Sequence, residues 1–241
     1  SGMSDVDFSF LKVTVGGGMA VQEHVAKAWK EKTGSPLLEG YGLTEASPVV
    51  CMNPLSNQQY NGSIGLPLPA TDVKFLDDAL NELKVGEVGQ LAVKGEQVMT
   101  GYWHQDEETK NVMTSDGYLL TGDIACMDDN GFIYLKERKK DLIIVSGFNV
   151  YPAEVEAVLV EHDAIYEAGV VGINKSEVGE VVIAFIVLED VVDTRPSDDV
   201  LKQWCREKLA AYKVPKSFHV IEQLPKTSVG KILRKDLRGL V

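Results

Sequence analysis

Apolar residues recur at helical spacing in three stretches of the chain. Gly34 follows the first stretch and is a typical stop signal, and Pro152 stands where the second would begin. The sequence therefore predicts helices at HVAKAWKEKTG (24–34), PAEVEAVLVEH (152–162) and DDVLKQWCREKLAAY (198–212). Residues 37–42, LLEGYG, predict a short strand that runs into a glycine-rich turn, so the start of the chain forms one α/β unit.

From about Ser63 to Tyr134 the pattern changes to short apolar runs separated by Gly, Asp and Asn. Such a pattern predicts a β-rich, barrel-like stretch, with strands at VKFLD, GQLAVKG, GYLLTGD and GFIYLKE. Later in the chain, DLIIVSGFNV predicts a hairpin around Ser146-Gly147, and three further runs predict strands: AIYEAGVVGI, EVVIAFIVLE and SFHVIEQL.

A change of composition near KERKKD indicates a joint between two bodies. We expect an α/β part at residues 4–60 and a β-rich, barrel-like part at 61–139, which together form the first domain, 4–139. The last hundred residues predict a small α+β domain at 140–241.

Net charge and composition indicate which kinds of partner and cellular location to expect. The 241 residues carry a formal net charge of −12, which argues against nucleic acid as a partner. No apolar run approaches the roughly 20 residues that span a bilayer and no signal peptide is recognisable, so we expect a cytoplasmic protein and leave peripheral contact with a membrane open. The cysteines lack metal-ligand spacing and are expected to be buried or free thiols: Cys51, Cys126 and Cys205.

One segment at the end of this acidic chain is strongly basic. LPKTSVGKILRKDLR (224–238) favours a small anion as its partner. Its cations are Lys226, Lys231, Arg234, Lys235 and Arg238.

The first candidate site is EGYGLTEASP (39–48). Gly42 lets the backbone turn sharply and approach a ligand, while Tyr41 offers a flat face, Thr44 a hydroxyl and Glu45 a carboxylate. These groups suit a purine, a phosphate and a divalent cation, although an ordinary turn after a strand has the same spacing.

Three further positions are candidate site residues, and an ordinary structural interpretation is open for each of them. Asp123 follows a glycine at a predicted strand end, where a carboxylate can accept hydrogen bonds from ribose hydroxyls. The alternative is that Asp123 is an ordinary turn residue. Arg138 offers a planar fork for phosphate or ribose oxygens, and the alternative for KERKKD is a solvated charged face. Gly147 is expected at the tip of the hairpin.

Taken together, YGLTE, TGD, RKKDLIIVSGFNVYPAEVE and PKTSVGK occur in the order of the adenylate-forming superfamily, which includes acyl-CoA synthetases, luciferases and peptide-synthetase adenylation domains. The resemblance runs from about Val15 to Arg238. LLEGYGLTE, NGSIGLPLP, VMTGYW and SGFNVYPAEVE look most like a bacterial long-chain fatty acid CoA ligase. The resemblance implies that residues 4–139 are the end of the large AMP-binding domain and that residues 140–241 are the small mobile domain.

The resemblance implies a role for each matching residue in a reaction that uses ATP, Mg²⁺, coenzyme A and a fatty acid. Thr44 and Glu45 would lie at the phosphates and at Mg²⁺, and Lys231 would be the catalytic lysine of adenylation. The remaining nucleotide contacts would be Gly17, Gly18, Tyr41, Gly42, Asp123 and Arg138.

In this family the small domain rotates between two poses, one for each half-reaction. Lys140 matches the hinge, and Gly147 would line the channel for the pantetheine of coenzyme A, where a side chain would collide.

The chain departs from the family's pattern at several points. It lacks the Ser/Thr/Gly-rich phosphate loop, so we expect a C-terminal fragment that is inactive by itself. GGGMAV, with Gly17 and Gly18, stands where relatives often have Gly-Ala-Pro, and Glu137 stands where many carry Gly or Asp.

Two other functions remain open. The first is an adenylation module that loads a carrier protein, and the second a non-catalytic nucleotide-binding or luciferase-like relative. Acyl chain length and oligomeric state are not readable from these residues.

Overall fold

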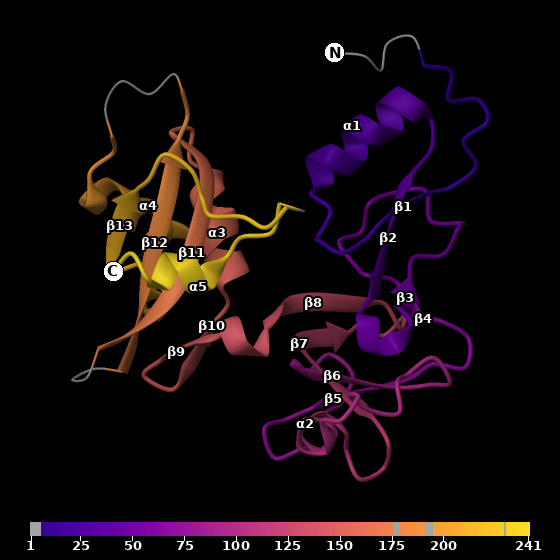
Figure 1. Ribbon diagram of the computed structural model, residues 1–241. Helices are drawn as coiled ribbons and strands as arrows, with labels where there is room; N and C mark the ends of the chain where they lie inside the picture. Colours follow the sequence, from indigo (N-terminus) through magenta and orange to yellow (C-terminus); the bar gives the residue numbers. More distant parts are fainter. Residues whose placement is uncertain (1–5, 176–178, 191–194, 229) are drawn as a thin grey trace. The chain divides into compact units, whose positions relative to one another are not determined.

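The computed structural model describes residues 6–175, 179–190, 195–228 and 230–241 (Figure 1). The chain divides into two units, Ser1–Lys136 and Glu137–Val241. This boundary lies a few residues before the joint placed at 139/140 from the change of composition, and residues 4 and 5 of the first predicted domain lie outside the described residues.

The first unit begins with two parallel strands connected by a helix. That helix ends at Gly34, as predicted, because Gly34 adopts a left-handed φ of 73° and its N–H donates to the carbonyl of Lys30 at 2.8 Å. The strands form one sheet in the order β1-β2-β3-β4, in which β1 and β2 are parallel and the other pairs are antiparallel. The elements are β1 (Thr14–Gly16), α1 (Glu23–Thr33), β2 (Leu37–Gly42), η1 (Thr44–Ala46), β3 (Val49–Met52) and β4 (Leu66–Pro67).

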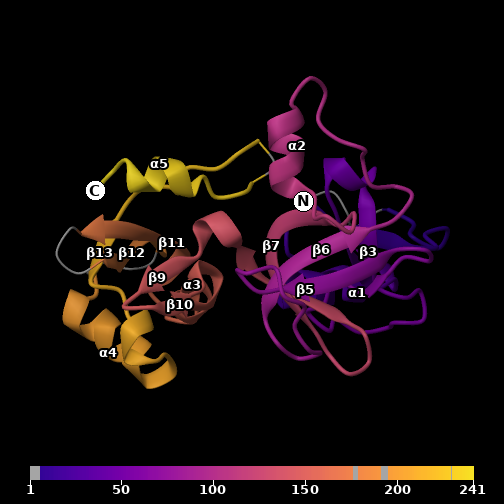
Figure 2. The same ribbon diagram turned by 90° about the horizontal axis from the view of Figure 1, so that it is seen from below.

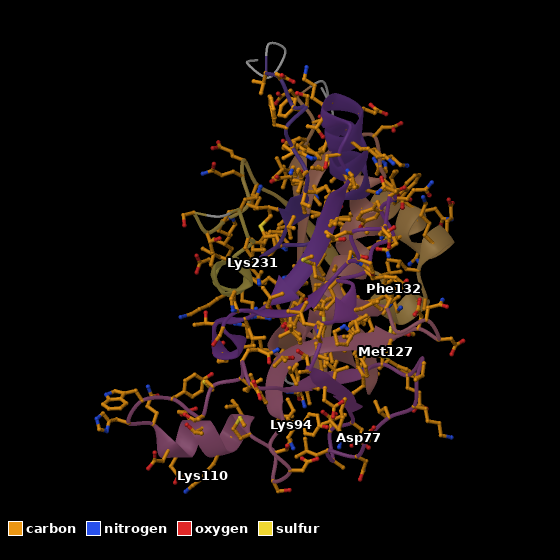
Figure 3. The ribbon with its side chains drawn as sticks, turned by 90° about the vertical axis from the view of Figure 1, so that its right-hand side faces the viewer. Asp77, Lys94, Lys110, Met127, Phe132 and Lys231 are labelled. Atoms are coloured by element: carbon orange, nitrogen blue, oxygen red, sulfur yellow. The ribbon has the colours of Figure 1, made fainter. Side chains whose placement is uncertain are left out.

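The predicted β-rich stretch forms a second sheet, in the order β5-β6-β7-β8. Its strands are β5 (Asp72–Leu76), β6 (Gly89–Lys94), β7 (Leu119–Met127) and β8 (Ile133–Arg138). The two sheets share one core, in which Val50 and Cys51 of β3 pack with Leu91 and Val93 of β6. Helix α2 (Asp106–Val112), which carries Lys110, has no buried residue and stands apart from the sheet (Figure 3).

The second unit is built on a three-stranded sheet with both faces covered. Successive residues of β12 point to opposite sides, so Val182 and Ala184 pack in one core while Ile183 and Phe185 pack in another. Helices α3 and α4 cover the first face and the C-terminal segment with α5 covers the second, as Figure 2 shows for α4 and α5. The elements are β11 (Ile165–Lys175), β12 (Gly179–Leu188), β13 (Ser217–Val220), α3 (Pro152–Val160), α4 (Asp198–Lys208), η3 (Ala211–Lys213) and α5 (Arg234–Arg238).

A tight hairpin precedes α3. Strands β9 (Ile143–Val145) and β10 (Phe148–Val150) pair antiparallel across a two-residue turn, and they follow the short helix η2 (Lys139–Asp141). Ser146 has φ 49° and Gly147 φ 84°, the two positive values that a type I′ turn requires. The hairpin predicted around these two residues is therefore confirmed.

Other expectations about the chain can also be compared with the structure. All three cysteines are free, and Cys51 and Cys205 are buried, as predicted. Among the described residues, no helix combines the length and the apolar content needed to cross a bilayer.

Candidate nucleotide and acyl-transfer site

The first group of candidate residues lies where the parallel strands β1 and β2 end. Carboxyl ends of parallel strands meet at one edge of a sheet, so the turn after β1 lies beside Tyr41, near the end of β2. A Cβ on Gly17 would lie 3.2 Å from the carbonyl oxygen of Gly40, and Gly18 has a left-handed φ of 81°. The sequence GGGMAV thus forms a tight turn against the strand that carries Tyr41.

Gly42 is required by a close approach of two backbone segments. A Cβ at this position would lie 2.0 Å from the carbonyl oxygen of Pro48. The same oxygen accepts a hydrogen bond from the N–H of Leu43 at 2.8 Å, which closes the loop 42–48. This loop holds η1, which begins with Thr44 and Glu45.

Replacing Gly42 by alanine should therefore destabilise the fold. We expect Gly42→Ala to lower the free energy of unfolding by at least about 2 kcal/mol, because the new methyl group cannot share space with a backbone carbonyl. Denaturant unfolding of the protein measures this. Gly40→Ala is the matched control, since its Cβ would make only ordinary contacts at 3.5 Å. Equal losses for the two variants would contradict this reading.

Tyr41 and Asp123 meet although 82 residues separate them. The phenol of Tyr41 donates to Oδ2 of Asp123 at 2.5 Å, and the residues are 9% and 7% exposed. Asp123 lies on β7 at an irregularity in the pairing with β6, where Gly122 has φ 74°. Burial, followed by the charge of Asp123, raises the pKa of the Tyr41 phenol, so the phenol remains a hydrogen-bond donor.

Glu45 is positioned by two hydrogen bonds. Its carbonyl oxygen accepts from the N–H of Met99 at 2.7 Å, and its Oε1 accepts from the hydroxyl of Tyr102 at 2.8 Å. Desolvation and the neighbouring Glu45 raise the pKa of Tyr102, which keeps that hydroxyl protonated. Tyr102 lies in the VMTGYW motif, but no local sequence pattern indicates its contact with Glu45. Thr44 is exposed beside Glu45 at the start of η1.

The other predicted site residues lie in the second unit. Arg138 ends β8 and Lys140 lies in η2, and both are exposed. Gly147 occupies the tip of the β9–β10 hairpin, and the structure places nothing within 4 Å of a Cβ added there.

Lys231 lies next to Ile232 in a second turn of the chain, closed by a bridge between Lys226 and Ile232, which we call the Lys231 hairpin. Lys226 and Ile232 form an isolated antiparallel bridge at its base, and the N–H of Thr227 donates to the carbonyl of Lys231 at 2.8 Å. The N–H of Lys231 in turn donates to the hydroxyl of Thr227 at 3.1 Å. Lys231 is exposed and is labelled in Figure 3. The backbone thus presents this side chain toward solvent.

Most cations of the basic segment are bound to carboxylates of the protein itself, which corrects our expectation that the whole segment faces a small anion. Three of its five cations are paired with carboxylates of the same unit. The pairs are Lys226 with Glu167, Arg234 with Glu156, and Arg238 with Asp141. Arg234 is the most buried of the three, with its side chain 11% exposed, and a buried cation needs a local partner.

Comparisons with known proteins give a family match in each of the two units. The family described as "AMP-binding enzyme" matches residues 2–103. The family described as "AMP-binding enzyme C-terminal domain" matches residues 154–231. The chain is 50% identical over 233 residues to the "Long-chain-fatty-acid--CoA ligase" of Salmonella typhimurium, covering 97% of this chain and 41% of that protein. It is 45% identical over 232 residues to the protein of the same name in Bacillus subtilis, covering 96% and 41%.

Solved structures agree with the sequence matches. ATP-bound MatB from Rhodopseudomonas palustris superposes with a TM-score of 0.88 at 32% identity, covering 95% of this chain and 45% of that one. The predicted fold class, the α/β and β-rich end of a large domain followed by a small α+β domain, is confirmed. The chain spans 41% of the length of the curated ligases described above. Together these matches show that the chain belongs to the family of AMP-binding, adenylate-forming enzymes.

Proposed function

We propose that the whole protein to which this chain contributes activates a long-chain fatty acid with ATP and transfers the acyl group to coenzyme A. The observation that carries the proposal is the buried pair of Tyr41 and Asp123 beside the loop that holds Thr44 and Glu45. The names of the relatives, at 45% to 50% identity, support a fatty acid as the acid substrate.

In the first half-reaction a carboxylate oxygen of the fatty acid attacks the α-phosphorus of ATP, which forms acyl-AMP and releases pyrophosphate. Tyr41 offers its ring face to the adenine. Asp123, whose carboxylate accepts a hydrogen bond from Tyr41, also accepts hydrogen bonds from the ribose hydroxyls. Thr44 donates its hydroxyl to a phosphate oxygen, and the turn of Gly17 and Gly18 borders the nucleotide and the acyl group.

Glu45 suits a magnesium ion that is shared with the substrate. No cluster of three or more His, Cys, Asp or Glu that could hold a metal occurs in the part of the chain that the structure describes. Mg²⁺ is commonly bound by one or two carboxylates together with substrate phosphates, so one held carboxylate is a fitting donor. The ion would neutralise phosphate charge, and Tyr102 orients the carboxylate that binds it.

Two cations of the second unit complete the adenylation step. The attacking carboxylate and the α-phosphate are both anionic, and a positive charge held between them offsets their repulsion. We assign this role to Lys231, because its backbone is constrained by the Lys231 hairpin while its side chain is exposed. Arg138 provides a planar donor for ribose or phosphate oxygens.

In the second half-reaction the thiol of coenzyme A attacks the acyl carbonyl, AMP leaves, and the thiol proton is released. The small domain rotates at Lys140, which withdraws Lys231 and brings the β9–β10 hairpin to the reaction centre. Gly147 then borders the pantetheine channel. Its positive φ and the open space around its Cβ position support a role in which a bare backbone is presented.

The products of the reaction test the proposal. Purified whole protein supplied with ATP, Mg²⁺, coenzyme A and fatty acids of C8 to C18 should release AMP and pyrophosphate and form acyl-CoA. Release of ADP and phosphate, or no dependence on the fatty acid, would contradict it. Acyl-AMP formation without transfer to coenzyme A would favour the alternative, an adenylation module that loads a carrier protein.

A further inference from the structure

The carboxylate of Glu137 connects three parts of the second unit. Glu137 begins the second unit, and its side chain is 6% exposed. Its Oε1 accepts a hydrogen bond from the N–H of Arg138 at 2.9 Å. Its Oε2 accepts from the N–H of Ala153, in the first turn of α3, at 3.2 Å and lies 3.6 Å from Nη2 of Arg234. One carboxylate thus contacts both α3 and the first residue of α5.

Arg234 is held in place by other bonds as well. Its Nη2 donates to both carboxylate oxygens of Glu156 at 2.9 and 3.0 Å, and its Nε donates to the carbonyl of Val170 at 3.3 Å. The N–H of Val170 completes the network by donating to Glu156 at 2.8 Å. The side chains of Arg234 and Glu156 are only 11% and 15% exposed. Arg234 is therefore a fixed anchor that joins α3, β11 and α5.

A second ion pair connects α5 with the segment around the proposed hinge. Arg238, one helical turn after Arg234, donates to Oδ1 of Asp141 at 3.3 Å, and the Asp141 side chain is 11% exposed. Asp141 follows Lys140 directly. This pair keeps its geometry when the backbone rotates at Lys140, because both partners lie on the same side of that residue.

The contacts of Glu137 with α3 and α5, in contrast, join residues on opposite sides of Lys140. Glu137 precedes Lys140 in the chain, whereas Ala153 and Arg234 both follow it. A rotation at Lys140 must carry Glu137 away from α3 and from Arg234. The ion pairs of Arg234 with Glu156 and of Arg238 with Asp141 would remain.

We propose that Glu137 is a positioning residue that acts as a latch across Lys140. Its contacts form in one pose of the small domain and are lost in the other, so its carboxylate sets the balance between the two poses and hence between the two half-reactions. The proposal rests on the proposed function, because a hinge at Lys140 is part of that function. In this proposal Arg234, which was expected near the substrate anion, instead binds the carboxylate of Glu137.

Separate measurement of the two half-reactions in the whole protein tests the latch. Glu137→Ala should slow one half-reaction while the other keeps or gains rate, so that the ratio of the two rates changes by about five-fold, the size expected for loss of one hydrogen bond. Hydrogen exchange should show faster exchange at the Ala153 amide. The matched control is Glu154→Ala, which removes the same charge from α3 but whose partner, Lys213, lies on the same side of Lys140.

The outcomes separate the latch from the function on which it rests. An unchanged ratio of rates in Glu137→Ala, or an equal change in Glu154→Ala, would overturn the latch while leaving the ligase activity established. A wild-type protein without fatty-acid-dependent acyl-AMP formation would overturn the proposed function and the kinetic role of Glu137 together. Hydrogen exchange at Ala153 would then still show whether Glu137 holds this amide.

Discussion

Replacing Lys231 by alanine in the whole protein is expected to slow acyl-AMP formation by about 10² or more, the usual cost of losing one preorganised charge at a transition state. Thioester formation from supplied acyl-AMP should keep its rate, because in that pose Lys231 is withdrawn. The Lys231 hairpin should persist, because backbone hydrogen bonds and the Thr227 hydroxyl stabilise it. Rapid-quench measurement of the two half-reactions checks both rates.

The same hairpin provides a matched control. Lys226→Ala also removes one positive charge, but Lys226 is paired with Glu167 at the base of the hairpin. We expect it to change the adenylation rate little, since exposed ion pairs contribute about 0 to 1 kcal/mol. Similar losses in both half-reactions for Lys231→Ala, or an adenylation defect of equal size in Lys226→Ala, would contradict a specific role for Lys231.

The opposite pattern is expected when Gly147 is replaced by leucine. Gly147→Leu should slow thioester formation by about 10² or more, a loss of the size caused by misplacing the reacting groups by about 1 Å. Acyl-AMP formation should stay near the wild-type rate. Nothing lies within 4 Å of the Cβ position in the second unit, so the loss should arise from the channel and not from packing inside this unit. Single-turnover transfer from acyl-AMP to coenzyme A measures it.

Backbone strain has to be separated from obstruction of the channel. Gly147 has φ 84°, so a leucine there costs about 1 to 2 kcal/mol of stability apart from any effect on the channel. Gly86→Leu is the matched control, because Gly86 has φ 89° in an exposed turn of the first unit with nothing within 4 Å of its Cβ position. Comparable loss of thioester formation in Gly86→Leu would show that strain, and not the channel, causes the defect.

Sequence patterns predicted the long periodic helices and strands, and turn residues predicted the short hairpin of β9 and β10. Helix α1 and strands β11 and β12 repeat apolar residues over 10 or 11 positions, and the structure confirms them. Two helices were not predicted from the sequence: α2, which buries no residue, and α5, which has five residues. Apolar spacing cannot indicate a helix that has no buried face or too few turns to define one.

The candidate site shows a second limit. Glycine-rich turns near Tyr41 and Asp123 were visible as separate motifs, but only the fold brings the phenol and the carboxylate to 2.5 Å, through a strand irregularity that no local pattern indicates. The ion pairs of Arg234 and Arg238 were also hidden, because their partners Glu156 and Asp141 lie 78 and 97 residues away. Charge counting along the chain therefore overstated how much of the basic segment faces a ligand.

The most direct test of the account follows the oxygen atoms of the acid. In the proposed sequence a carboxylate oxygen of the fatty acid becomes bonded to the α-phosphorus and leaves with AMP when coenzyme A attacks the carbonyl. Whole protein should therefore convert a fatty acid labelled with ¹⁸O in its carboxylate into AMP that carries one ¹⁸O atom. Label in inorganic phosphate, or AMP without label, would contradict activation through acyl-AMP.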